Sequence, residues 1–531
     1  MTSDPPKMVW LGRDAAEETV TAELVGAKAA GIWRMARLGL RTPAAFALPT
    51  TLCAAANARP KAAASLVADG LREGMARLEA ETRRRFGDVR APLVVSVRSG
   101  AARSMPGMLS TVLNVGLGPE AVHGLIRLSG NPRFAWDSYR RFIESYATVV
   151  GQAPANAFAG ALADMVRAES AADESELDGE ALERLCAIFG DIAAAQATRP
   201  IPLDPMDQLS EAARAVFRSW ESRKAREYRR LNGLEGLSGT AVTVQAMVFG
   251  NDGRRSGSGV AFTRNPATGE KAPYVDFLFD AQGEDVVSGR RTPLEAAAVA
   301  AGLPEAFAEL VQGAGQLERA LGDVQDIEFT IEDGVLFFLQ MRAAKRAPKA
   351  ALRIAVDLVH EGVIDRKTAL ARLAEVDIAQ AASSRFAEPA EPVASGIAAA
   401  PGMASGRAAF DNASAKQLAA EGAPVVLVRR EPATEDIEGF AVAKAILTAC
   451  GGRTAHAAVV ARQMGKVCIV GCQGLDLEAA PARLGARPLH QGDWISLDGD
   501  TGEVTLGRRT IVTEPPSELA EISAWRSETV A

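Results

Sequence analysis

The sequence GGRTAHAAVVAR, residues 451–462, decides most of what we expect of the fold of this chain. Gly451 and Gly452 suit a sharp turn, because glycine adopts backbone angles that are closed to other residues. Thr454 can cap a helix that follows, and the apolar run after His456 is compatible with that helix. The free N–H groups and the dipole at a helix start favour a phosphoryl group there. The stretch therefore predicts a strand-to-helix turn that presents His456 to an incoming group.

The stretch alone leaves a second interpretation of His456 open. An isolated histidine more often packs or caps than reacts. The chain has four histidines, and His456 is the one that stands among small residues directly after a glycine pair. The remaining sequence has to decide between the two roles.

The composition is typical of a globular protein with sizeable cores. The chain has 531 residues, of which 48% are hydrophobic and 24% charged, and this length predicts about two to four domains. The net charge of −7 argues against nucleic acid or an anionic membrane as a main partner. Five cysteines without paired spacing indicate a reduced, cytoplasmic setting. The N-terminus shows no signal pattern, and no apolar run of about twenty residues occurs, so we expect no membrane span.

The chain divides into four predicted parts, and the expected fold class is α+β / α/β multidomain. Residues 1–345 mix glycine-punctuated strands with helices, as expected of a nucleotide-binding body. Residues 346–393 hold helices and a small, acidic, proline-containing linker. Short Val/Ile strands fill a compact domain at residues 394–508, and residues 509–531 form a tail without a fold signal.

Residues 97–108 (VRSGAARSMPGM) contain the end of a short apolar strand and the glycine- and arginine-containing segment after it. We expect this strand to end at Arg98. A loop of this kind can aim backbone N–H groups at phosphate oxygens, with Arg98 supplying charge beside Ser99 and Gly100. An ordinary surface loop has a similar composition, so the segment alone leaves both interpretations open.

A hairpin with its turn at residues 332–334 (EDG) is predicted near residue 330. Asp326 and Glu328 are two residues apart on the first strand, so both carboxylates face the same side. Gln340 and Arg342 have the same spacing on the second strand and return to that face. Mg²⁺ prefers such hard oxygen ligands and shares them with nucleotide phosphates. A solvated polar face of the hairpin is the alternative.

These segments closely resemble the pyruvate, phosphate dikinases, enzymes that use phosphoenolpyruvate, and the resemblance covers about residues 25–506. It implies an ATP-grasp-like nucleotide-binding domain followed by a swivelling phosphohistidine domain of β/β/α type. In that family ATP gives its β-phosphoryl group to the histidine and its γ-phosphoryl group to inorganic phosphate, which leaves AMP and pyrophosphate. Whether water takes the place of inorganic phosphate as the acceptor of the γ-phosphoryl group stays open.

The resemblance also implies a role for each candidate residue. His456 is implied to be the nucleophile and phosphoryl carrier. Thr454 matches a regulatory phosphorylation site, although Ala455 stands where the family usually has serine. Mg²⁺ is implied at Glu328 and Gln340. The nucleotide and its phosphates are implied to contact the remaining set: Lys28, Arg98, Ser99, Gly100, Arg140, Glu284, Asp326 and Arg342.

The acceptor of the phosphoryl group has no recognisable site in this sequence. Full-length dikinases continue into a large (β/α)₈ barrel that binds phosphoenolpyruvate or pyruvate. Because this chain ends before such a barrel, we expect pyruvate or another small acceptor to bind on a separate subunit. Whether the chain forms a homo-oligomer stays open. The alternative function is a non-catalytic regulatory or binding paralogue of a complete dikinase, against which the intact His456, Glu328, Gln340 and Arg342 argue.

Overall fold

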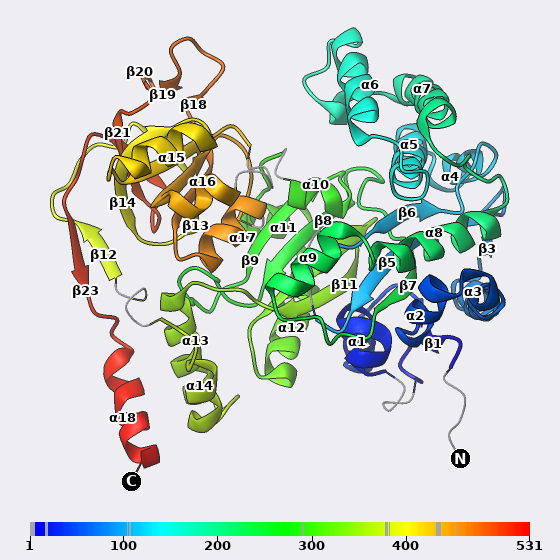
Figure 1. Ribbon diagram of the computed structural model, residues 1–531, viewed down its shortest axis with the longest axis horizontal. Coiled ribbons are helices and arrows are strands. Elements are labelled where there is room, and N and C mark those ends of the chain that lie inside the picture. Colours follow the sequence, from blue (N-terminus) through cyan, green and yellow to red (C-terminus); the bar gives the residue numbers. More distant parts are fainter. Residues whose placement is uncertain are drawn as a thin grey trace. The chain divides into compact units, whose positions relative to one another are not determined.

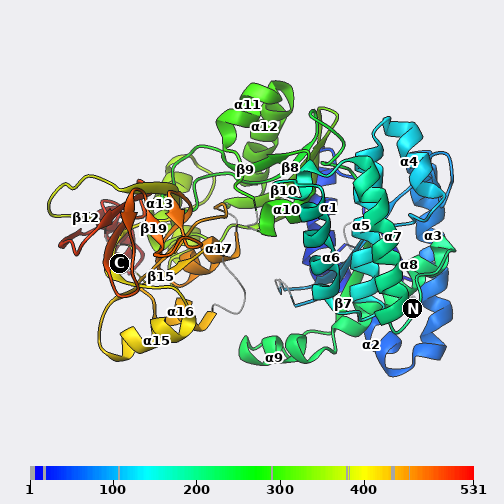
Figure 2. The same cartoon turned by 90° about the horizontal axis from the view of Figure 1, so that it is seen from above.

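The chain is a mixed α/β multidomain protein that divides into two compact units (Figures 1 and 2). The first unit holds Met1–Gly253 with Phe337–Gln340, and the second holds Arg254–Leu336 with Met341–Ala531. Among the described residues, no helix is long and apolar enough to cross a membrane. The computed structural model describes residues 6–15, 20–103, 105, 108–288, 291–377, 381, 383–431, 437–453 and 455–530.

The first unit is built on a five-stranded antiparallel sheet with the strand order β1-β2-β7-β5-β6. The central strands β5 and β7 are buried along most of their length, so both faces of the sheet are covered. The strands are β1 (Val9–Trp10), β2 (Ala45–Leu48), β5 (Val95–Ala101), β6 (Thr111–Val115) and β7 (Thr240–Ala246), and β3 (Arg85–Phe86) and β4 (Pro92–Leu93) form a separate pair. The helices of this unit include α1 (Ala22–Arg37), α2 (Thr51–Ala58), α3 (Pro60–Thr82), α4 (Ala121–Ser129), α5 (Pro132–Val149), α6 (Ala155–Ala168), α7 (Gly179–Gln196), α8 (Pro205–Ser219) and α9 (Arg223–Leu231).

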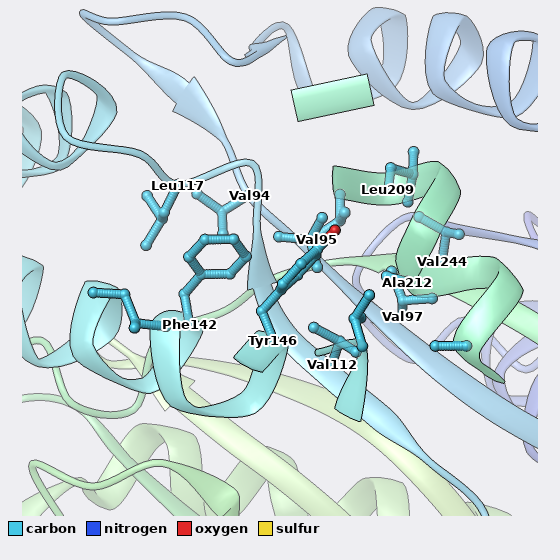
Figure 3. Close-up of a cluster of buried hydrophobic side chains, with 14 of the residues drawn as sticks. Val94, Val95, Val97, Val112, Leu117, Phe142, Tyr146, Leu209, Ala212 and Val244 are labelled. Carbon is cyan, nitrogen blue, oxygen red and sulfur yellow. The ribbon is translucent and has the colours of Figure 1, made fainter. Parts of the chain in front are cut away.

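Helix α5 packs aromatic side chains onto this sheet (Figure 3). It begins after Asn131, whose side chain accepts a hydrogen bond from the Phe134 N–H, and Pro132 occupies its first position. Phe142 and Tyr146 are four residues apart and therefore share one face of the helix. Both are buried in the cluster that includes the valines of β5 and β6. Burying each such side chain contributes about 1.5–3 kcal/mol, and this burial anchors α5 to the sheet.

A buried ion-pair network joins α5 to the segment that follows β7. Asp137 is 5% exposed and accepts hydrogen bonds from Arg140 (2.6 Å), Arg141 (2.9 Å) and the Asn251 amide (2.9 Å). Burial alone would raise the pKa of Asp137, but the guanidinium groups of Arg141 and Arg140 outweigh it and hold that pKa well below its usual range. The Asp137 carboxylate is therefore charged at neutral pH.

A four-stranded sheet with the order β11-β10-β8-β9 belongs to the second unit except for Phe337–Gln340 of β11, which are grouped with the first unit. The predicted hairpin is confirmed, because β10 and β11 flank a turn at which Asp333 and Gly334 have φ angles of 44° and 80°. The strands are β8 (Gly257–Phe262), β9 (Tyr274–Phe279), β10 (Gln325–Glu332) and β11 (Val335–Ala343). The helices around the sheet include α10 (Gly283–Ser288), α11 (Ala296–Gly302), α12 (Pro304–Leu321), α13 (Pro348–His360) and α14 (Arg366–Arg372).

The second unit also contains a closed barrel with the strand order β13-β17-β16-β15-β14-β21-β22. Its strands are β13 (Ala394–Ala400), β14 (Met403–Ala409), β15 (Val425–Arg429), β16 (Ala445–Thr448), β17 (Val467–Gln473), β21 (Trp494–Asp498) and β22 (Glu503–Leu506). A small sheet of β18 (Leu475–Asp476), β19 (Arg483–Leu484) and β20 (Arg487–Pro488) follows β17. Strands β14 to β17 are parallel neighbours, and parallel strands require crossover connections. These are α15 (Asn412–Ala420), α16 (Ile437–Val442) and α17 (His456–Gln463).

The linker and the tail form regular structure that the sequence analysis did not predict. Strand β12 (Ser383–Phe386) pairs antiparallel with β23 (Ile511–Glu514). Helix α18 (Leu519–Val530) lies beside α13 and α14 (Figure 1), where Ile522 and Trp525 are buried. The tail lacks a visible pattern because few of its described apolar side chains enter a core and because its strand partner is far away in the sequence.

Replacing Asp137 with asparagine should lower the free energy of unfolding by about 3–5 kcal/mol, because Arg140 stays buried without its closest counter-charge. The pKa of Asp137 is lower in the folded than in the unfolded chain. Its stabilisation is therefore complete above about pH 4 and lost as the pH falls toward the folded-state value. Urea unfolding at several pH values measures both effects.

The matched control for this change is Asp164→Asn, since Asp164 forms an exposed ion pair with Arg167 on α6. We expect this control to change the free energy of unfolding by less than about 1 kcal/mol. Equal effects of the two substitutions, or a pH dependence unaltered in Asp137→Asn, would contradict the assignment of Asp137 as a structural charge.

Candidate functional site

The predicted phosphate loop begins later in the structure than in the sequence analysis. Ser99 and Gly100 continue β5 and pair with β7, and the Gly100 N–H donates a 3.1 Å hydrogen bond to the Thr240 hydroxyl. The prediction that the strand ends at Arg98 was wrong, because β7 supplies pairing partners that the local sequence does not reveal. Arg98 is half-buried and forms no ion pair with another described residue. Positions 104, 106 and 107 lie outside the described part of the chain.

A close backbone approach brings Lys28 near the end of β5. Gly26 interrupts α1 with φ 83° and ψ 156°, a conformation that is essentially restricted to glycine. A Cβ at Gly26 would lie 2.2 Å from the Gly100 carbonyl oxygen. Lys28 lies in the first turn after this interruption, where the N–H groups of a helix start favour phosphate. Lys28 and Gly100 therefore belong to backbone segments in direct contact.

Two polar side chains of β7 are candidate contacts that the sequence analysis did not single out. In the register of the sheet, Thr243 pairs with Arg98 and Gln245 pairs with Ser96. Thr243 is 0% exposed and Gln245 is 2% exposed. Within the described residues, the Thr243 hydroxyl and the Gln245 side-chain nitrogen have no hydrogen-bond partner. Leaving buried polar groups unpaired is costly, so both are suited to a ligand. Their alternation with Val242, Val244 and Ala246 was the signal that could have identified them.

The hairpin gathers the acidic part of the candidate site. Asp326 is 6% exposed, and one of its oxygens, Oδ2, accepts a 2.7 Å hydrogen bond from the Arg342 guanidinium. Burial raises the pKa of Asp326, and the Glu328 carboxylate adds to this, against the opposing charge of Arg342. Burial lowers the pKa of Arg342, but the Asp326 and Glu328 carboxylates outweigh it and raise that pKa above its usual value. The prediction that Asp326 and Arg342 meet across the hairpin is confirmed.

The donor set of the hairpin fits Mg²⁺. Within the described residues, the second oxygen of Asp326, Oδ1, is buried without a hydrogen-bond partner. Glu328 follows two residues later, and Gln340 lies on the neighbouring strand with an exposed fraction of 6%. The described residues contain no group of three or more His, Cys, Asp or Glu side chains that could hold a metal alone. Mg²⁺ takes most of its ligands from phosphates and water, so two carboxylates and an amide suffice beside a nucleotide.

Two residues predicted to contact the nucleotide, Glu284 and Arg140, lie apart from the hairpin and from the end of β5 in the sequence. Glu284 is exposed in the first turn of the short helix α10. Arg140 is 3% exposed, and its guanidinium pairs with Asp137, Glu144 and Glu174. A phosphate contact by Arg140 would require these ion pairs to break. The phosphate contact of Arg140 stays a prediction.

His456 is the first residue of α17, directly after a turn in which Gly451 has a φ of 109°. The strand-to-helix turn predicted from the sequence is therefore confirmed. Ala455 is the residue directly before the helix, and among the described residues no side chain caps it. Thr454 itself lies outside the described residues. A helix start without a side-chain cap leaves its N–H groups to an anion.

Arg462 holds the turn that precedes His456, and the sequence analysis did not select it. Its side chain is buried, with an exposed fraction of 2%. The guanidinium donates 2.7 Å hydrogen bonds to the carbonyl oxygens of Arg453 and Ala399. It also lies over the Phe262 ring, 5.8 Å from the centroid. No described carboxylate pairs with this guanidinium, and a buried cation is costly. Two backbone carbonyls and a ring offset part of that cost.

Two domain models match this chain, and they cover neither Lys28 nor the hairpin at residues 325–343. Residues 56–304 match the AMP/ATP-binding domain of pyruvate phosphate dikinase, and residues 422–502 match the mobile domain of PEP-utilising enzymes. The chain is 42% identical over 511 residues to pyruvate, phosphate dikinase 1 of Oryza sativa subsp. japonica, which covers 95% of the chain and 54% of that relative. It is 43% identical over 491 residues to pyruvate, phosphate dikinase of Clostridium symbiosum, covering 91% of the chain and 56% of that relative.

The chain belongs to the pyruvate, phosphate dikinase family. It spans a little over half the length of the dikinases that it matches. The domain models show a dikinase nucleotide-binding domain and a phosphohistidine-type mobile domain, while the roles of the individual site residues stay predictions.

Replacing Gly26 with alanine should displace the end of β5 and weaken ATP binding by on the order of tenfold or more, since small displacements in a binding site have large effects. Backbone strain at this position also costs about 1–3 kcal/mol. Calorimetric titration with Mg·ATP and thermal unfolding measure the two effects.

Gly160→Ala is the matched control for Gly26→Ala, because a Cβ at Gly160 in α6 meets nothing within 4 Å. We expect Gly160→Ala to bind ATP normally and to be up to about 1 kcal/mol more stable. Normal ATP affinity in Gly26→Ala would show that the approach of Gly26 to Gly100 does not position the site.

Proposed function

We propose that this chain is an ATP-dependent phosphotransferase of the dikinase type. It transfers the β-phosphoryl group of ATP to His456 and the γ-phosphoryl group to inorganic phosphate, which yields AMP and pyrophosphate. The observation that carries the proposal is the combination, in one chain, of a dikinase AMP/ATP-binding domain with a PEP-utilising mobile domain whose α17 begins at His456.

The donor side of the reaction relies on charge neutralisation. Phosphoryl transfer requires in-line positioning and compensation of the charge on the phosphate oxygens. Lys28 and Arg98, beside the Ser99–Gly100 segment, supply positive charge in the first unit. Arg342 supplies it on the hairpin of the second unit. Glu328 and Gln340, assisted by Asp326, would hold Mg²⁺, which neutralises phosphate charge when it is bound.

Three features of α17 support His456 as the carrier. The neutral imidazole nitrogen is a nucleophile, and protonation of the ring removes its lone pair, so acid slows the transfer. The start of α17, which no described side chain caps, favours the phosphoryl group that the ring then holds. Arg462, also on α17, holds the turn that precedes this helix through the Arg453 carbonyl.

The second half of the reaction would deliver the phosphoryl group to pyruvate or to another small acceptor. The relatives are named pyruvate, phosphate dikinases, and this name supports pyruvate as the acceptor. The expectation that a separate subunit binds the acceptor stays a prediction.

Incubation with β-labelled ATP, Mg²⁺ and inorganic phosphate tests the proposal directly. We expect an acid-labile label on the wild-type chain, since the label forms a phosphohistidine, and no label on His456→Asn. His490→Asn is the matched control, because His490 is an exposed histidine of the same domain, and it should be labelled like the wild type. An unlabelled wild-type chain, or label that survives His456→Asn, would contradict the proposal. Labelling that needs no phosphate would favour water as the γ-phosphoryl acceptor.

A further inference from the structure

Arg453 stands three residues before His456 and extends from the mobile domain onto the nucleotide-binding part of the second unit. Its guanidinium forms a 2.8 Å ion pair with Glu295. The same group lies over the Tyr274 ring, with its central carbon 4.2 Å from the ring centroid. A third contact is the 3.4 Å hydrogen bond that its Nε donates to the Ala398 carbonyl. These contacts leave 17% of the Arg453 side chain exposed.

Tyr274 adds a second connection between the same two parts. It belongs to β9, and its hydroxyl donates a 3.1 Å hydrogen bond to the carbonyl of Ala398 in β13 of the barrel. The ring is 8% exposed, and burial raises the pKa of the phenol, so the hydroxyl keeps its proton as a donor. Ala398 therefore accepts hydrogen bonds from both Arg453 and Tyr274.

The backbone beside Arg453 is fitted closely to the opposite surface. A Cβ at Gly452 would lie 2.5 Å from the Pro293 ring and 3.0 Å from an Asp276 carboxylate oxygen. A Cβ at Gly471 would lie 3.5 Å from the Thr292 methyl carbon. Small residues thus allow the turn before His456 to lie directly on the segment that ends at Glu295.

We propose that Arg453 is a docking and positioning residue for phosphorylation of His456. Its ion pair with Glu295 and its contact with Tyr274 hold the mobile domain against the nucleotide-binding domain while His456 receives the phosphoryl group. Glu295 and Tyr274 lie within the matched AMP/ATP-binding domain, and Arg453 lies within the matched mobile domain. The inference rests on the proposed function, since it names the contact through which the two matched domains meet.

Two variants test whether the charge of Arg453 matters: one reverses that charge, and the other exchanges the charges of Arg453 and Glu295. Arg453→Glu places two carboxylates opposite each other, and such like-charge contacts oppose association. We expect the labelling rate at saturating ATP to fall by on the order of tenfold, with little change in the ATP concentration that gives half the maximal rate. The double variant Arg453→Glu with Glu295→Arg restores opposite charges and should recover most of the rate.

The matched control for charge reversal is Arg487→Glu, at an exposed arginine on β20 of the same domain, and it should be labelled like the wild type. Hydrogen exchange supplies a readout without catalysis. Amide exchange in residues 292–295 should quicken in Arg453→Glu and slow again in the double variant.

The outcomes separate this inference from the proposed function. A wild-type chain that acquires no label contradicts the proposed function itself. A labelled wild-type chain with unchanged labelling in Arg453→Glu overturns only the docking role of Arg453. A slow Arg453→Glu variant that Glu295→Arg does not rescue would also overturn it, because the charge pair would then not be the cause.

Discussion

The pair formed by Asp326 and Arg342 is the interaction on which the proposed chemistry depends. Burying a carboxylate is costly, and a buried ion pair adds little stability by itself. Arg342 neutralises one oxygen of Asp326 at 2.7 Å, while the other oxygen has no partner among the described residues. Burial also raises the pKa of Asp326. This combination is poorly explained by folding alone, and it is well explained by a site that completes its charges when a nucleotide and Mg²⁺ bind.

Backbone geometry positions the other parts of the machinery. Gly26 and Gly100 approach so closely that no side chain fits between them, and this approach sets Lys28 beside β5. The turn before His456 is held by Arg462 through two carbonyl groups and is seated on the nucleotide-binding part by Arg453. The first arrangement depends on a contact between two backbone segments, and the second depends on two long cationic side chains. Such contacts can fix a position without using the reacting groups themselves.

Local patterns predicted the elements that depend on local physics. The hairpin around Glu328 was predictable because alternation and an acidic glycine turn both specify it, and the turn before α17 was predictable from its glycine pair. The continuation of β5 through Ser99, the strand β23 and the unpaired groups of Thr243 and Gln245 were not. Each depends on a partner strand or a burial pattern far away in the sequence. The contacts of Arg453 likewise become visible only in three dimensions.

Isotope exchange between AMP and ATP in the absence of pyruvate tests the central claim most directly. If His456 accepts the β-phosphoryl group from Mg·ATP, the half-reaction is reversible and moves labelled AMP into ATP when phosphate and pyrophosphate are present. The account predicts this exchange in the wild-type chain and its loss in His456→Asn and in Glu328→Gln. Absence of exchange in the folded wild-type chain, or exchange that persists in His456→Asn, would contradict it.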